Sequence, residues 1–250
     1  MGYNNEFAAT RGPLIFDLET APLPNAADYL EPVTAAKNLK DPEKVKADIE
    51  QRTKDRDDLC GLDYNTARIV CLGTIVDGVE DVSLLRCEAD EREALRLFWV
   101  VQQGRKLIGF RIRDFDLPML IQRSRYLGLT HPEIDLGKYS RGGRVVDLFD
   151  MLTFQDSQRT FAMRRTLHAF CRRFGIPVTD DTAGSEIAAL VAAEKWGDVA
   201  AHCGSDIRLT KALAEQLGVL VVKVAPTMPT TGEIVDQLRE RQAQAKAAAF

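Results

Sequence analysis

The sequence predicts an α/β protein with a mixed five-stranded sheet flanked by helices, and three features of the chain support this fold class. Apolar runs rich in strand-forming residues occur five times, at residues 14–20, 68–76, 79–86, 106–110 and 145–149. The dipeptide Asp77-Gly78 between the second and third runs is a strong signal for a hairpin turn, which makes that pair antiparallel. The later runs alternate with helical stretches, as parallel strands joined by crossover helices do.

The first apolar run carries two carboxylates, Asp17 and Glu19, two residues apart. Side chains alternate along a strand, so both carboxylates point to one face and their apolar neighbours to the other. At about 4 Å, two like charges repel by roughly 1 kcal/mol in water and by about 4 kcal/mol at an effective dielectric of 20. Mg²⁺ would relieve that repulsion, because it takes carboxylate oxygens as ligands. Taken alone, the pattern also fits an acidic pair that caps a helix or meets an arginine.

A charged insertion, residues 25–63, follows the prolines that end the first strand. Asp41-Pro42-Glu43 is typical of a helix start, because proline is favoured at the first helical position. The helix expected from there to about Asp58 has few apolar residues to bury, so we expect it to be exposed over one edge of the domain. Residues 88–101 have apolar side chains at helical spacing and predict a second helix.

Asp116 lies in the sequence Phe-Asp-Leu-Pro, near the start of a helix expected at residues 114–127. This helix follows the 106–110 strand, and parallel α/β sheets usually bind ligands at the C-terminal ends of their strands. The alternative is an acid in the first turn that stabilises the helix dipole. Asp147, on the last strand, is a further acid for which a structural and a catalytic role are equally open.

His202 and Asp206 are four residues apart, which places them on one face of a late helix. That face continues through leucines into the core, although the two side chains could also form a hydrogen-bonded surface pair. Three helices are expected after the last strand, at residues 163–174, 184–195 and 198–219. We assign residues 11–222 to one domain, residues 1–10 to a loose N-terminus and residues 223–250 to a helical tail that opens on a capping box.

Composition narrows the classes of protein that fit. The formal charge of −4 provides no global positive field for nucleic acid, but residues 105–173 hold 14 Lys/Arg against 7 Asp/Glu. Five cysteines without Cys-x-x-Cys spacing argue for reduced thiols in a cytoplasmic protein, and against a zinc site or a disulfide framework. No apolar run is long enough to span a membrane, and the N-terminus lacks a signal-peptide core.

Taken in order, these acidic motifs resemble those of the DEDD superfamily of 3′→5′ exonucleases, which have the ribonuclease H-like fold. The most similar group is the predicted exonucleases related to the proofreading domain of family B DNA polymerases. The resemblance extends over roughly residues 11–222. Its strongest local matches are Phe16-Asp17-Leu18-Glu19-Thr20, Phe115-Asp116-Leu117-Pro118 and Cys203-Gly204-Ser205-Asp206.

The resemblance implies a function and a set of site residues. The chain is expected to be a metal-dependent 3′→5′ exonuclease with a ribonuclease H-like sheet, acting on single-stranded DNA. Asp17, Glu19, Asp116 and Asp206 are implied as ligands of two divalent cations, Mg²⁺ or Mn²⁺, with His202 as the general base. The candidate nucleic-acid contacts are two aromatic residues and four arginines: Phe110, Arg111, Arg113, Tyr139, Arg141 and Arg144.

Two departures from the family pattern stand out. Histidine occupies position 202 at the four-residue spacing that carries tyrosine in the DEDDy branch, whereas the DEDDh branch has its histidine five residues before the aspartate. Gly109-Phe110-Arg111 stands where the family often has Gly-His-Asn. Two alternatives stay open: an RNA exonuclease of the same fold, and a nucleic-acid-binding module that keeps the carboxylates but is catalytically weak.

Overall fold

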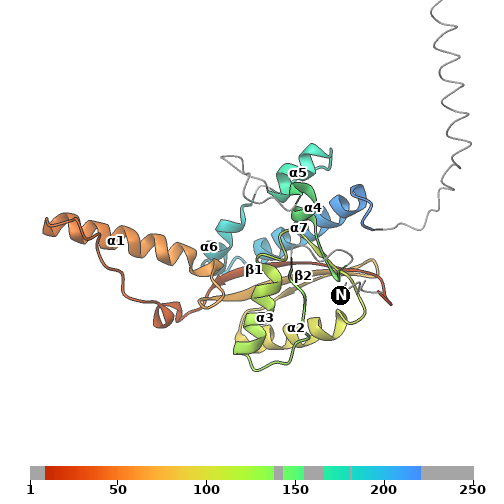
Figure 1. The fold of residues 1–250 in the computed structure, drawn as a ribbon, viewed down its shortest axis with the longest axis horizontal. Coiled ribbons are helices and arrows are strands. Elements are labelled where there is room, and N and C mark those ends of the chain that lie inside the picture. The colour runs from red at the N-terminus through yellow and green to blue at the C-terminus, as the bar shows by residue number, and fades with distance from the viewer. Residues whose placement is uncertain (1–8, 138–142, 155–165, 181, 221–250) are drawn as a thin grey trace, which may run out of the picture.

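The computed structural model describes residues 9–137, 143–154, 166–180 and 182–220, and within them the chain folds around a mixed five-stranded sheet in the order β3-β2-β1-β4-β5 (Figure 1). The strands are β1 (Leu14–Pro22), β2 (Ala67–Val76), β3 (Val79–Leu84), β4 (Leu107–Gly109) and β5 (Val145–Asp147). β1 pairs antiparallel with β2, and β2 with β3, whereas β1, β4 and β5 run parallel. The predicted mixed sheet, antiparallel at the hairpin and parallel afterwards, is confirmed.

Helices cover both faces of this sheet (Figure 1). One face carries α2 (Glu88–Val101) and α3 (Asp116–Tyr126), and the other carries α4 (Leu148–Thr153), α5 (Leu167–Arg173), α6 (Ile187–Ala192) and α7 (Trp196–Gln216). The side chains of β1 follow the two layers. Leu14, Phe16 and Leu18 pack into the cluster with α2 and α3, whereas Ile15 packs into the cluster with α7.

The longest of these helices, α7, lies directly against the sheet. A Cβ atom at Gly73 on β2 would come within 2.8 Å of Cys203 Sγ and 2.9 Å of the Ile207 side chain. A residue with a side chain at position 73 would therefore push α7 away from the strands. This close approach brings the polar face of α7 next to the carboxylates of β1.

A buried ion pair joins the helices of the opposite layer. Arg123 on α3 donates two hydrogen bonds of 2.7 Å to the carboxylate of Glu91 on α2. The same carboxylate accepts the backbone N–H of Ile69 on β2 at 2.9 Å. Both charged side chains are almost fully buried, so this contact ties α2, α3 and β2 together.

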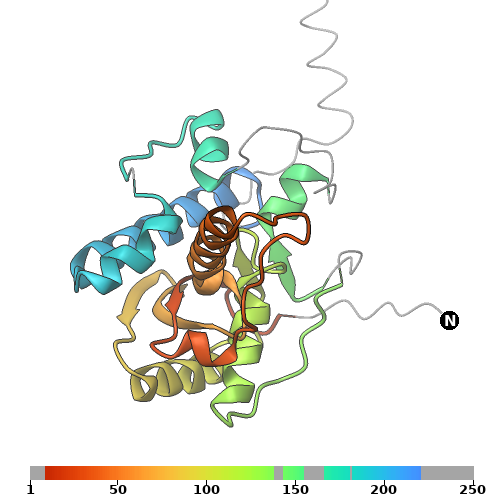
Figure 2. The same cartoon turned by 90° about the vertical axis from the view of Figure 1, so that its left-hand side faces the viewer.

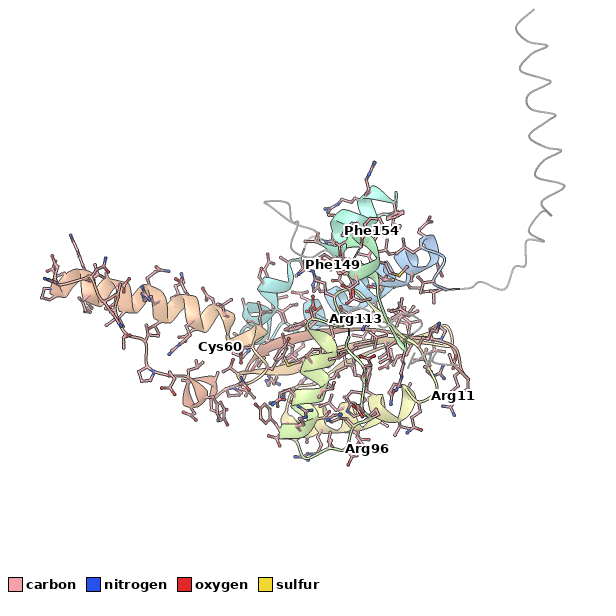
Figure 3. All side chains as sticks on the ribbon, in the orientation of Figure 1. Arg11, Cys60, Arg96, Arg113, Phe149 and Phe154 are labelled. Carbon is pink, nitrogen blue, oxygen red and sulfur yellow. The ribbon has the colours of Figure 1, made fainter. Side chains whose placement is uncertain are left out.

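The charged insertion is tied to the sheet at its end, where Thr20 Oγ1 on β1 donates a hydrogen bond of 2.6 Å to the carbonyl oxygen of the buried Gly61. It contains η1 (Ala26–Tyr29), α1 (Pro42–Leu59) and η2 (Cys60–Leu62), and Asp41 caps α1 by accepting two backbone N–H groups. No residue of α1 is buried, as predicted, and its side chains point outward all round (Figure 3). The prediction that it lies over an edge of the domain is wrong. α1 projects away from the sheet in Figure 1 and toward the viewer in Figure 2.

Several predicted boundaries differ from the structure. The last strand ends at Asp147, because the carboxylate of that residue caps α4, so the two residues after it belong to a helix and not to the predicted strand. The helix predicted at residues 184–195 is a 3₁₀ turn, η4 (Gly184–Glu186), followed by the short α6. The predicted tail at residues 223–250 and residues 1–8 lie outside the described parts of the chain. Within the described parts, no helix is long and apolar enough to cross a membrane.

Candidate active site

Two of the candidate carboxylates lie on β1, the central strand of the sheet. Asp17 and Glu19 point to the α7 face, opposite Phe16 and Leu18 in the other core cluster, as the alternation of the strand predicts. The pairing of β1 with β2 changes register directly after Glu19. Such irregularities bend a strand and are common beside active sites.

Asp116, the first residue of α3, joins the two acids of β1 through the backbone. Its Oδ1 atom accepts the N–H of Leu18 at 3.1 Å, and its side chain is only 4% exposed. The turn that leads to it is tight, because a Cβ at Gly109 would overlap Ile112 and approach the carbonyl oxygen of Phe16 to 3.0 Å. Burial raises the pKa of Asp116 to about 7, although the backbone hydrogen bonds that it accepts oppose the shift.

His202 and Asp206 come to the same place from α7. The Nε2 atom of His202 lies 3.6 Å from Glu19 Oε1 and 4.0 Å from Asp206 Oδ2. The histidine side chain is only 4% exposed. The spacing of four residues therefore places both groups on the inward face of the helix, beside the acids of β1, and not on the surface.

Together these residues form a strongly acidic cleft of about 780 Å³. Burial and then the neighbouring carboxylates raise the pKa values of Asp17 and Glu19 well above their ordinary range. Burial also raises the pKa of Asp206, against the opposing effect of the two nearby histidines. Among the described residues, no lysine or arginine forms an ion pair with Asp17, Glu19, Asp116 or Asp206. The donor set therefore fits a divalent cation, which takes oxygen ligands and would supply the missing positive charge.

Two polar residues that contact the acid–histidine pair of α7 were missed in the sequence. His168 on α5 places its Nε2 atom 3.2 Å from Asp206 Oδ1. Asp180, in the segment between α5 and η4, places Oδ2 2.5 Å from His202 Nδ1. The only signal for His168 was the rarity of histidine, with three in the chain, and no motif spacing pointed to Asp180.

The predicted nucleic-acid contacts divide into three groups. Phe110 and Arg111 line the cleft, as expected for residues that follow β4. Arg113 and Arg144 do not line it, so their prediction as phosphate contacts is wrong for this structure. Tyr139 and Arg141 lie outside the described residues.

Both misplaced arginines have structural partners. Arg113 is buried, donates to the carbonyl oxygens of Gly137 and Val145, and pairs with Asp150 at 3.2 Å. Arg144 precedes β5, at the end of the parallel strands away from the cleft, and donates to the carbonyl oxygens of Gln102 and Arg105. The prediction relied on the local excess of basic residues, which does not show that these two arginines bond to backbone carbonyl oxygens within the protein.

Asp147 has a structural role in this arrangement. Its carboxylate accepts the backbone N–H groups of Arg111 and Arg113 at 3.0 and 2.9 Å, and also caps α4. Arg111 has a left-handed backbone with φ of 63°, which is uncommon for a residue with a long side chain. Asp147 thus holds the turn that presents the Arg111 guanidinium over the ring of Phe149, 4.0 Å from its centre.

Known structures share this fold. The chain is similar to the family B DNA polymerase from the hyperthermophilic archaeon Pyrobaculum calidifontis, with a TM-score of 0.52 and 20% sequence identity. The match covers 83% of this chain and 24% of the polymerase chain, so this chain spans about a quarter of the polymerase. At this identity the likeness concerns the fold, and it agrees with the ribonuclease H-like architecture expected from the sequence. A search of curated proteins finds no match to this sequence.

A protein family matches more than half of the chain. Residues 64–213 match the family described as "Predicted 3'-5' exonuclease related to the exonuclease domain of PolB". The matched region contains Asp116, His202 and Asp206, and it begins after β1, so Asp17 and Glu19 join the site through the fold. This chain therefore belongs to the family of predicted 3′-5′ exonucleases related to the exonuclease domain of PolB.

Proposed function

We propose that this chain is a metal-dependent 3′→5′ exonuclease that removes nucleotides from the 3′ end of single-stranded DNA. The observation that carries the proposal is the meeting of four carboxylates in one cleft, from β1, α3 and α7, with Glu19 and Asp116 buried and Asp17 and Asp206 partly buried. A set of carboxylate oxygens next to an open cleft is typical of enzymes that use divalent cations on phosphates. Membership of a family of predicted exonucleases supports the same reaction class.

The four carboxylates would hold two divalent cations, Mg²⁺ or Mn²⁺. When bound, such ions supply Lewis acidity to the reacting phosphate and balance its charge. The oxygen ligands would come from Asp17, Glu19, Asp116 and Asp206. The pKa values of all four are raised without a cation, and a bound cation would lower them and favour the ionised carboxylates.

His202 would act on the attacking water, because its Nε2 atom faces Glu19 and Asp206. In the proposed step, Nε2 takes a proton from the water, whose oxygen forms a new bond to phosphorus. The bond between phosphorus and the 3′ oxygen of the preceding nucleotide breaks, and that oxygen takes up a proton from solvent. The products are a nucleoside 5′-monophosphate and a strand with a free 3′-hydroxyl, shortened by one nucleotide.

The rim of the cleft offers contacts for a nucleic acid strand. Arg111 and Arg172 line it and would contact phosphates, which position a strand without reading its sequence. Phe110 lies beside them and would stack on a base. These contacts favour a single strand, whose bases are free to stack, and they do not distinguish DNA from RNA.

Labelled oligonucleotides provide the test. Single-stranded DNA and RNA, labelled at either end, are incubated with the protein and Mg²⁺ or Mn²⁺, beside a closed circular DNA. The expected result is stepwise shortening from the 3′ end of DNA, abolished by EDTA. Faster shortening of RNA would reassign the substrate, and binding without hydrolysis would indicate a nucleic-acid-binding module. Nicking of the closed circle as the main activity would overturn the proposal.

A further inference from the structure

We infer that Asp180 is the positioning residue of His202, holding its ring in the tautomer that carries the proton on Nδ1 and leaves Nε2 free toward Glu19 and Asp206. The catalytic consequence of this inference rests on the proposed function, whereas the tautomer itself does not. No motif spacing in the sequence points to Asp180. It reaches the site from the segment before η4, 22 residues away from His202 along the chain.

The contact between the two side chains is short and shielded from solvent. Asp180 Oδ2 lies 2.5 Å from His202 Nδ1, and the exposed fractions of the two side chains are 16% and 4%. An ionised carboxylate can only accept hydrogen bonds, so the Nδ1 atom must carry the proton. Among the described residues, the opposite ring nitrogen, Nε2, has no hydrogen-bond partner. It lies 3.6 Å from Glu19 Oε1, which is beyond hydrogen-bond distance.

Asp180 is itself held in place before it meets the histidine. Its Oδ1 atom accepts the backbone N–H of Thr182 at 2.9 Å, while Oδ2 faces His202. Burial opposes ionisation, but the hydrogen bonds from His202 and Thr182 outweigh it and lower the pKa of Asp180 below its ordinary value. The group that orients His202 is therefore a fixed anion at neutral pH.

This arrangement gives asparagine at position 180 a distinctive effect. The Thr182 N–H requires an acceptor, so the amide oxygen of the substituted side chain would take the place of Oδ1. The amide NH₂ group would then face His202 and donate to Nδ1, which forces the ring proton onto Nε2. Alanine at the same position would remove the partner without imposing the wrong tautomer.

The test compares Asp180→Asn with Asp180→Ala, using the full chain. NMR measures the ¹⁵N chemical shifts of the His202 ring nitrogens in the Mg²⁺-loaded protein, at a pH where the histidine rings are neutral. The signals that disappear in His202→Gln identify those of His202. The wild type should carry its proton on Nδ1, and Asp180→Asn should carry it on Nε2. With single-stranded DNA and Mg²⁺, Asp180→Asn should lose about 10- to 100-fold in kcat with little change in KM. Asp180→Ala should lose less.

The order of the two variants separates positioning from a structural role. Asparagine has nearly the same shape as aspartate. If the contact were merely structural, Asp180→Asn should therefore keep a higher melting temperature and a higher rate than Asp180→Ala. Asp198→Asn, an exposed acid on α7, is the matched control and should leave the shifts and the rate unchanged. A wild-type ring protonated on Nε2, or an Asp180→Asn enzyme with wild-type kcat, would overturn the inference. Failure of the wild type to cleave any substrate would overturn the proposed function and leave the NMR result to decide the tautomer.

Discussion

Asp116 and Leu18 are joined by a hydrogen bond across 98 residues of sequence, in which the Asp116 carboxylate accepts the Leu18 N–H at 3.1 Å. Since Leu18 lies between Asp17 and Glu19, this bond fixes the first residue of α3 against the strand that carries the other two acids. The third carboxylate is thus positioned by the main chain of β1. Its charge can be removed by an amide whose oxygen keeps the same bond.

Asp17→Asn and Asp206→Asn should each abolish hydrolysis and raise the melting temperature of the metal-free protein. Each change removes a negative charge from a cluster of carboxylates whose burial and mutual repulsion raise their pKa values. Melting in EDTA and cleavage of end-labelled DNA measure the two effects. Asp198→Asn, which removes an exposed acid from the first turn of α7, should leave cleavage unchanged and should not raise the melting temperature. Substantial Mg²⁺-dependent turnover by both site variants would exclude this assignment.

The metal-free protein should become less stable as the pH rises from about 5 to 7. The folded pKa of Asp116 is about 7, above its ordinary value of 3.8, so between these values the folded state binds more protons than the unfolded state. Stability then falls with rising pH, by up to about 1.4 kcal/mol per proton and pH unit. Melting temperatures in EDTA across this range measure the slope. Asp116→Asn should make the slope smaller but not zero, because Asp17 and Glu19 also have raised pKa values, and an unchanged slope in that variant would contradict the shift.

His202→Ala should lower the rate by about a hundredfold or more, in line with the loss of a general base. Binding of Mn²⁺, measured by calorimetry, should survive because the four oxygen ligands remain. His202→Tyr should recover part of the rate, since tyrosine occupies this spacing in the DEDDy branch. Loss of metal binding by His202→Ala would show that the histidine is a metal ligand. If the variant kept both metal binding and the wild-type rate, His202 would not be a catalytic residue.

Arg111→Ala should weaken binding of single-stranded DNA and reduce the slope of log K against log salt by about one, as for one lost phosphate contact. Arg111 lines the cleft and is presented there by the turn that Asp147 holds. Fluorescence titration at several salt concentrations measures both values. Arg125→Ala removes an exposed arginine of α3 outside the cleft and serves as the control. Equal effects of the two substitutions would mean that Arg111 contributes only to the overall charge.

Glu91→Gln should destabilise the fold by about 3–5 kcal/mol, because it leaves the buried Arg123 guanidinium without its counter-charge. Urea unfolding measures the change. Glu93→Gln breaks the pair with Arg96, which is exposed on the same helix, and should cost at most about 1 kcal/mol. Similar losses for the two variants would show that the buried pair contributes no more than a surface pair.

Much of this fold follows from patterns within a few residues of one another. Asp77-Gly78 predicted the hairpin, and Asp41-Pro42 predicted the start of α1. Strand alternation also predicted that Asp17 and Glu19 share a face. These features could be predicted because turn geometry, capping and alternation depend on neighbouring residues alone. Asp147 also caps α4 locally, but the hydrogen bonds that its carboxylate accepts from the N–H groups of Arg111 and Arg113 join it to another segment, which no local pattern indicates.

The partners of the site residues depend on how distant segments pack. His168 and Asp180 meet Asp206 and His202 only because the chain around α5 and before η4 lies against α7. Arg113 counts as one more positive charge along the chain, yet in the folded protein it is buried against Asp150 and two carbonyl oxygens. A sequence records which side chains are charged. The packing of the helices on the sheet decides where these side chains point and which groups they contact. This is because a charged group can be buried without a large cost only where it forms an ion pair or hydrogen bonds.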